Sequence, residues 1–448
     1  MTAQIPTQQS VSASEMLEKI RQQFDNAPYP RVPIEKSPKD DANLLYFHNL
    51  TTSYYLRNQQ VIDLKGKVIL DAGCGTGYKT LILALANPEA RIVGIDFSEE
   101  SVRLAEKRLQ FHGVDNVEFH VLLLEDLPKL GINFDYINCD DVLYLLEDAT
   151  TGLQAMKSVL TPEGIIRANL HSSLQRANFF RAQKLFKFMG LMDNNPEEME
   201  LGIVRDIMKA LKDGVLIKTQ TWNPRSETEN EAILANHMLV GDKGFTIPEF
   251  FAILRGAGLE FISMVNWMQW DVMELFKEPD NLPAYVAMCL PDLSDQEKLH
   301  LFELIHPNQR LLDLWCGHPE QGHSFTPIVE WTDSDWQNSK AYLHPQLKTP
   351  KFREDLTACV TELRAFPISQ HLPLIEPVVS IDSAMAICLL RLLEQPQPIM
   401  ALVENWKQIR PLDPITLKPI EHEQAFNLIQ QMLLRLEGLG YVMLERQA

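Results

Sequence analysis

An acid and glycines in alternate positions form the part of this chain best suited to chemistry. The apolar run 68–70 comes directly before them and predicts a buried strand, and the helical pattern of 78–86 after them ends at Asn87-Pro88. Glycines in such a strand-to-helix turn tolerate positive φ and let a ligand approach the backbone closely. The free N–H groups at the helix start favour polar or anionic groups. The motif residues are Asp71, Gly73, Gly75 and Gly77.

A second acid follows at the distance that a nucleoside site requires. The apolar segment 91–95 predicts a second strand, and Asp96 ends it. An acid about twenty residues after a glycine loop, at the tip of the second strand, can hold ribose hydroxyls. A glycine turn without a ligand would need neither Asp71 nor Asp96. We therefore expect a cofactor that contains a nucleoside.

The spacing of the glycines distinguishes between two kinds of cofactor. A dinucleotide loop reads G-x-G-x-x-G, but here Tyr78 stands in place of the third glycine. Asp71 is suited to a cationic amino-acid group and unsuited to a diphosphate. The segment resembles the first motif of class I S-adenosylmethionine-dependent methyltransferases, which reads D/E-x-G-x-G-x-G. The alternative, a nicotinamide enzyme, is disfavoured.

The resemblance implies S-adenosylmethionine as the cofactor and names the side chains that contact it. They are Asp71, the motif glycines, Asp96 and Phe97. After a predicted third strand at 117–121, the segment 122–128 is similar to the family's adenine-binding segment. Leu123 stands where an Asp is common in that segment, so the adenine contact falls to Glu125 or to the Leu124 backbone.

The acceptor side of the site is expected at the ends of the next strands. Segment 134–139 predicts the fourth strand, and ligands of open α/β sheets bind beyond the carboxyl ends of strands. Asp140, Asp141 and Tyr144 should therefore face the methyl-transfer cavity, with Asp140 also near the cofactor. His171 follows the predicted fifth strand, 165–170, and would be the general base for a hydroxyl acceptor, as His48 would be if the N-terminal arm folds over. Helix capping or core packing remains the alternative role for Asp140, Asp141 and Tyr144.

Alternating strand and helix patterns predict an α/β fold with a Rossmann-like methyltransferase sheet of parallel strands and right-handed crossovers. Segment 160–164 resembles the family's turn before the fifth strand. A helical insertion at 174–244 should form a lid over the acceptor pocket. Thr246 is the expected N-cap of the helix that follows, and a late strand is expected at 259–265.

Three regions are predicted along the chain. Residues 1–37 form an N-terminal arm, 38–290 the methyltransferase domain, and 294–448 a mostly helical accessory domain. The accessory domain has helix patterns at about 352–364, 381–394 and 421–437, and its end suggests a winged-helix wing or a small appended domain. This domain could dock a protein substrate, mediate dimerisation or act as a structural cap. Segment 311–318 only superficially resembles a second glycine motif, because no acid-tipped strand follows.

Composition excludes several classes. A net charge of −19 and a pI near 5.1 argue against a nucleic-acid surface, which needs clustered Lys and Arg. No apolar run approaches the ~20 residues that span a bilayer. The polar start carries no export signal, and the dispersed cysteines fit a reducing compartment, so we expect a cytoplasmic protein. Cys316, His318 and His323 lack the paired spacing of a zinc site, so no metal is expected.

Three functions remain open from the sequence. The first is methyl transfer to a small molecule or natural product that binds under the lid. The second is methylation of a protein side chain, with the C-terminal domain as a docking module. The third is a non-catalytic scaffold that keeps the cofactor fold, which the joint presence of Asp71, the glycines and Asp96 disfavours.

Overall fold

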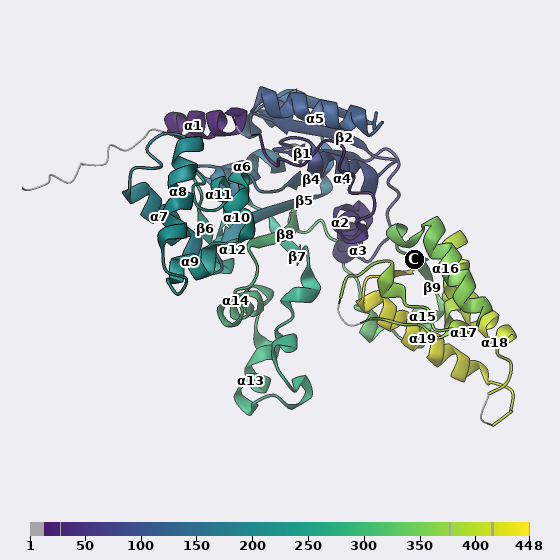
Figure 1. Ribbon diagram of the computed structural model, residues 1–448. Coiled ribbons are helices and arrows are strands. Elements are labelled where there is room, and N and C mark those ends of the chain that lie inside the picture. Colours follow the sequence, from purple (N-terminus) through teal and green to yellow (C-terminus); the bar gives the residue numbers. More distant parts are fainter. Residues whose placement is uncertain (1–12, 27, 376–377, 414–415, 448) are drawn as a thin grey trace, which may run out of the picture. The chain divides into compact units, whose positions relative to one another are not determined.

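The computed structural model describes residues 13–26, 28–375, 378–413 and 416–447 (Figure 1). The chain divides into two compact units. The first comprises Met1–Lys36, Lys67–Leu81 and Arg91–Pro319, and the second comprises Ser37–Gly66, Ile82–Ala90 and Glu320–Ala448. Within the described residues, no helix is both long and apolar enough to cross a bilayer.

The first unit is built on one sheet, which contains eight strands among the residues described. Its order is β3-β2-β1-β4-β5-β8-β7, with the short β6 beside β5. Neighbours from β3 to β5 are parallel, whereas β8 runs antiparallel to both β5 and β7. This confirms the predicted Rossmann-like α/β fold. The strands are β1 (Val68–Ala72), β2 (Arg91–Asp96), β3 (Val117–Val121), β4 (Phe134–Cys139), β5 (Leu160–Ser172), β6 (Gly244–Phe245), β7 (Glu260–Met264) and β8 (Leu311–Gly317).

Helices connect these strands, and their ends follow local sequence signals. Ser98 caps the start of α5 by accepting a hydrogen bond from the Ser101 N–H. Thr246 and Glu249 form the reciprocal capping box of α12, as expected for Thr246, and α12 stops at Gly258 with φ of +68°. The helices are α1 (Ala13–Asn26), α4 (Tyr78–Ala86), α5 (Glu99–Phe111), α6 (Ala149–Lys157), α12 (Ile247–Ala257), α13 (Ala284–Cys289) and α14 (Asp295–Ile305).

The core of the first unit joins the sheet to the helices that follow β4 and β6. Leu70 and Ile166 of the sheet, Leu153 of α6 and Phe250 of α12 belong to one buried apolar cluster. Helix α12 also contacts both α6 and α14. Burial of these apolar side chains stabilises the unit, and their close packing fixes the positions of the strand ends that carry the site.

The insertion after β5 is helical, as predicted. It contains α7 (Ala177–Phe188), α8 (Glu198–Ala210), α9 (Leu216–Thr221), α10 (Pro224–Thr228) and α11 (Asn230–Leu234). Phe186, Val204 and Ile233 are fully buried in a separate apolar cluster of this segment. The apolar stripe of α7 is therefore core, although Phe188 at its end is 90% exposed.

Two expectations about the sheet were wrong. The catalytic domain was expected to end near residue 290, but β8 completes its sheet and the first unit runs to Pro319. The long excursion 265–310 separates β8 from β7 in the sequence and hid this relationship. Segment 160–164, expected to be a turn, begins β5 as a bulge, since Phe134 pairs with Leu160 and Tyr136 with Ile165.

The second unit is assembled from separate stretches of chain and is not a simple C-terminal appendage. The Thr52 hydroxyl lies 3.0 Å from Nε2 of His344, and the Tyr55 hydroxyl donates to Glu437 over 2.9 Å. Strand β11 pairs with β9, which is far away in the sequence, and not with an adjacent strand of a hairpin wing. The elements are α2 (Ala42–His48), α3 (Leu50–Asn58), α15 (Asp333–Gln337), β9 (Ser339–Leu343), α16 (Pro350–Thr361), α17 (Ser383–Glu394), β10 (Gln397–Pro398), α18 (Ile399–Ile409), α19 (His422–Gly438) and β11 (Val442–Arg446).

Candidate functional site

The glycine loop joins β1 to α4 and adopts the conformation that its sequence predicts. Gly73, Gly75 and Gly77 have φ of +82°, +50° and +79°. A Cβ on Gly77 would lie 2.7 Å from the Cα of Ala105 in α5, so this glycine allows two elements to pack closely. A Cβ on Gly75 would collide with the carbonyl oxygen of Tyr29. The loop therefore tolerates no side chain at either position.

The N-terminal arm lies against this loop through backbone groups. The Thr76 N–H donates to the Tyr29 carbonyl over 3.1 Å, and the Thr76 hydroxyl donates to the Pro30 carbonyl over 2.7 Å. Arg108 of α5, 2% exposed, donates to the carbonyls of Thr76, Val32 and Pro33 at 2.7–2.9 Å. The arm therefore contacts the glycine loop through its backbone carbonyls.

Asp96 faces the glycine loop from the end of β2. Its carboxylate accepts hydrogen bonds from the N–H groups of Gly75 and Ser98, both at 2.9 Å. Burial raises the pKa of Asp96, and the two backbone donors oppose that shift. The adjacent Phe97 ring meets Phe24 of α1 edge to face, with centroids 6.4 Å apart. Helix α1 therefore covers the position beside the expected ribose site.

Asp71 is more deeply buried than a ligand contact requires. Its two carboxylate oxygens accept from the Thr80 hydroxyl at 2.6 Å and from the Asn138 amide at 2.9 Å. Burial raises the pKa of Asp71 to about 6. Asp71 therefore ties β1 to α4 and β4, which fixes the shape of the loop.

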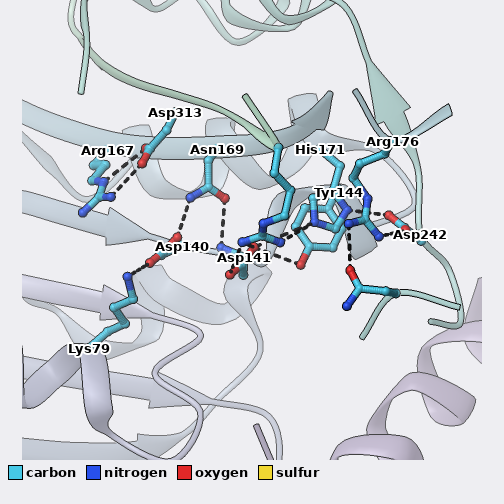
Figure 2. Close-up of polar contacts among 12 residues, drawn as sticks. Lys79, Asp140, Asp141, Tyr144, Arg167, Asn169, His171, Arg176, Asp242 and Asp313 are labelled. Carbon is cyan, nitrogen blue, oxygen red and sulfur yellow. Dashed lines mark hydrogen bonds and ion pairs between the residues drawn. The ribbon is translucent and has the colours of Figure 1, made fainter. Parts of the chain in front are cut away.

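A row of charged and amide side chains crosses the neighbouring strands (Figure 2). Oδ2 of Asp140 lies 2.5 Å from Nζ of Lys79, and its other oxygen accepts from the Asn169 amide. Arg167 of β5 pairs with Asp313 of β8 at 2.6 Å. The buried acids Asp140 and Asp313 are thus each paired with a basic side chain.

A second network holds His171 in a fixed orientation. Nδ1 of His171 lies 2.6 Å from Asp242, whose other oxygen accepts from Arg176 at 3.0 Å and Gln183 at 2.8 Å (Figure 2). Nε2 of His171 lies 2.8 Å from a guanidinium nitrogen of Arg310. Since Arg310 can only donate, Nε2 is the acceptor and Nδ1 carries the hydrogen. Burial, with Arg176 and Arg310 nearby, lowers the pKa of His171, so the ring is neutral at pH 7.

A pocket opens beside these groups. Asp141, with φ of +58°, follows β4 and accepts from the Tyr144 hydroxyl and from Arg310, each at 3.2 Å. Tyr29 of the arm and Glu231 of the insertion also line the pocket. The remaining lining residues are Gln23, Phe24, Pro28, Arg31, Leu145, Leu234, Ala235 and Leu239.

The structure therefore brings several predicted residues together and separates others. Asp141 and Tyr144 line the pocket, whereas His171 is fully buried beneath Tyr144. Asp140 lies toward Lys79 and the glycine loop. The Leu124 side chain is buried at the start of a short 3-10 helix (Leu124–Leu130), and Glu125 is exposed there.

Sequence reasoning missed several residues of this site. Arg310 comes directly before β8, a strand that was not recognised, and Asp242 lies at the end of the insertion. Arg108 sits in a helix whose sequence gives no sign of a buried arginine. Lys79, in the first turn of α4, was also missed, although it lies two positions after the last glycine of the recognised motif in the sequence.

Comparison with known proteins defines the class. Residues 63–231 match the family model described as a methyltransferase domain. An uncharacterised protein of Synechococcus is 27% identical over 316 residues, which cover 70% of this chain and 73% of that protein. Demethylmenaquinone methyltransferase of Geobacillus stearothermophilus is 36% identical over 102 residues, which cover 22% of this chain and 44% of that enzyme.

A solved structure shares the fold over most of the chain. PKMT2 of Rickettsia typhi aligns with a TM-score of 0.56 and 17% identity, over 90% of this chain and 75% of that one. At this identity the likeness shows the fold alone. The family match confirms the activity expected from the glycine loop: residues 63–231 form a methyltransferase domain, and the resemblance of the loop is to the class I S-adenosylmethionine-dependent methyltransferases. S-adenosylmethionine is the cofactor of that class.

Proposed function

We propose that this enzyme methylates a small molecule or natural product that enters the pocket lined by Tyr29, Asp141, Tyr144 and Glu231. The observation that carries the proposal is the position of this pocket. It lies beyond the carboxyl end of β4, where ligands of open α/β sheets bind, and the arm and the insertion both contribute to its wall. The proposal is also supported by the similarity to demethylmenaquinone methyltransferase over 102 residues, because the name of that enzyme indicates a small-molecule acceptor.

The residues around the glycine loop fit the cofactor. The positive φ of Gly73, Gly75 and Gly77 gives the tight strand-to-helix turn that such a cofactor loop requires. Asp96 is oriented by backbone donors and would accept from the ribose hydroxyls. Phe97 would then lie beside the ribose. The adenine contact falls to Glu125 or to the Leu124 backbone at the start of the short helix after β3.

Methyl transfer requires the acceptor to approach the methyl group in line with the bond that breaks. The bound cofactor supplies an electrophilic methyl group on a sulfonium, and the chain supplies orientation and a shielded cavity. Tyr144 and Asp141 would face the acceptor. His171 would act through Tyr144, because its ring nitrogens are engaged by Asp242 and Arg310.

A protein side chain is the alternative acceptor, with the second unit as a docking module. A non-catalytic scaffold is the third reading. The test is transfer of labelled methyl groups from S-adenosylmethionine to a fractionated cell lysate, with the Gly75→Val variant as control. Label in the extractable fraction, absent with the variant, supports the proposal. Label bound to protein would transfer the assignment to a protein substrate, and no transfer despite cofactor binding would favour the scaffold.

A further inference from the structure

An ion pair stands beside the glycine loop. Lys79 is the second residue of α4, two positions after Gly77, and its Nζ lies 2.5 Å from Oδ2 of Asp140. Asp140 follows β4 directly, and β4 is the neighbour of β1 in the sheet. The pair therefore bridges the two strand ends between which a ligand of the glycine loop must lie (Figure 2).

The two partners differ in how freely they can respond to a ligand. The Asp140 side chain is 4% exposed and held by the Asn169 amide, whereas the Lys79 side chain is 32% exposed on a flexible stem. Asp140 is thus a fixed negative charge, and Lys79 is a positive charge that can shift by rotation of its side chain.

Asp71, which the loop motif would assign to the amino group of the cofactor, is already committed within the protein. Its oxygens hold the Thr80 hydroxyl and the Asn138 amide, and it is 1% exposed. The amino-acid end of the cofactor carries an ammonium and a carboxylate. It therefore needs a negative and a positive partner close together, and within the described site the Lys79–Asp140 pair offers both.

We propose that Lys79 and Asp140 bind the amino-acid end of the cofactor, with Lys79 on its carboxylate and Asp140 on its ammonium. This inference rests on the proposed function, because it needs the cofactor at the glycine loop. A zwitterion that inserts into the pair brings one charge of each sign, so no buried charge is left uncompensated. Both new contacts are charge-assisted hydrogen bonds.

The test compares two ligands that differ only at this end. S-adenosylhomocysteine carries the amino-acid group, and 5′-methylthioadenosine has the same nucleoside and sulfur without it. Calorimetric titration of Lys79→Met should show affinity for S-adenosylhomocysteine reduced about tenfold, the size of one charge-assisted hydrogen bond. Affinity for 5′-methylthioadenosine should stay unchanged. Asp140→Asn should behave in the same way, and Lys79→Arg should retain most of the affinity.

Lys67→Met is the matched control, since Lys67 also pairs with an acid, Asp135, at 2.9 Å, before the amino end of β1. It should leave both ligands unaffected. If Lys79→Met weakened the binding of both ligands equally, or if the folded variant bound both as the wild type does, the proposed roles of Lys79 and Asp140 would be wrong. Failure of the wild-type protein to bind either ligand would instead contradict the proposed function itself.

Discussion

The ring of Tyr144 stacks on the ring of His171, with centroids 3.7 Å apart and planes 18° from parallel. His171 is fully buried, and its contact with Asp242 ties the end of β5 to the end of the insertion. The wall of the pocket is thus held by a histidine that does not itself line it. Tyr144 is the side chain of the two that can meet an acceptor.

Replacing His171 with Phe should separate positioning from proton transfer. Phe keeps a ring against Tyr144 but removes the donor to Asp242. We expect the free energy of unfolding to fall by about 1–3 kcal/mol, the cost of an unmade buried hydrogen bond. Turnover should fall less than about tenfold, with an unchanged pH profile, because no proton passes through His171.

Single-turnover methyl transfer across pH, combined with chemical unfolding, measures both quantities. Tyr144→Phe is the companion variant, since it keeps the stack and removes the hydroxyl that donates to Asp141. Loss of a hundredfold or more in the His171 variant, roughly the contribution of a general base, would return His171 to a catalytic role.

Arg108→Met should loosen the N-terminal arm. The variant loses donors to the carbonyls of Thr76, Val32 and Pro33, at a cost of about 2–3 kcal/mol for the unsatisfied buried groups. Trypsin should then cleave faster after the exposed Arg31, and cofactor affinity should fall. Arg103→Met, on the exposed face of the same helix, should change neither. Unchanged cleavage after Arg31 would show that other contacts hold the arm.

Two glycines with similar backbone conformations should respond differently to Ala. Gly77 has φ of +79° and a new Cβ there meets Ala105, whereas Gly113 has φ of +66° and open space around it. Gly77→Ala should cost roughly 3 kcal/mol or more through displacement of α5, and Gly113→Ala only about 1 kcal/mol of backbone strain. Thermal unfolding and cofactor titration check this prediction, and equal effects would contradict it.

The buried carboxyl of Asp71 should make stability depend on pH. Its pKa is raised by burial to about 6, above its unfolded value, so protonation favours the folded state. That contribution is complete below about pH 4 and is lost as pH rises through 6, a change of roughly 2–3 kcal/mol. Asp71→Asn mimics the protonated form. Its stability relative to the wild type should therefore rise between pH 4.5 and pH 7.5, measured by urea unfolding. A difference that stays constant would contradict the assignment.

Much of the fold followed from local patterns. The strands from β1 to β4 and the helix N-cap at Thr246 were predicted, because each depends on residues within a few positions of one another. The glycine loop predicted the class for the same reason, since its spacing determines which ligand can approach the backbone.

What escaped the sequence depends on contacts between distant segments. Strand β8 joins the sheet after the excursion 265–310, and Arg310 reaches Asp141 only because of that pairing. His171 was expected to be a base because it follows the predicted strand 165–170 in the sequence. The sequence does not reveal that both ring nitrogens of His171 are engaged by Asp242 and Arg310.

Titration of S-adenosylhomocysteine into the wild-type protein and into Gly75→Val tests the central claim most directly. The cofactor is expected at the glycine loop, and a β-branched side chain at Gly75 would collide with the Tyr29 carbonyl and displace the arm from that loop. Saturable binding to the wild type, with none to a folded Gly75→Val variant, is the predicted result. Equal binding to both proteins, or tight binding of NAD without binding of S-adenosylhomocysteine, would contradict it.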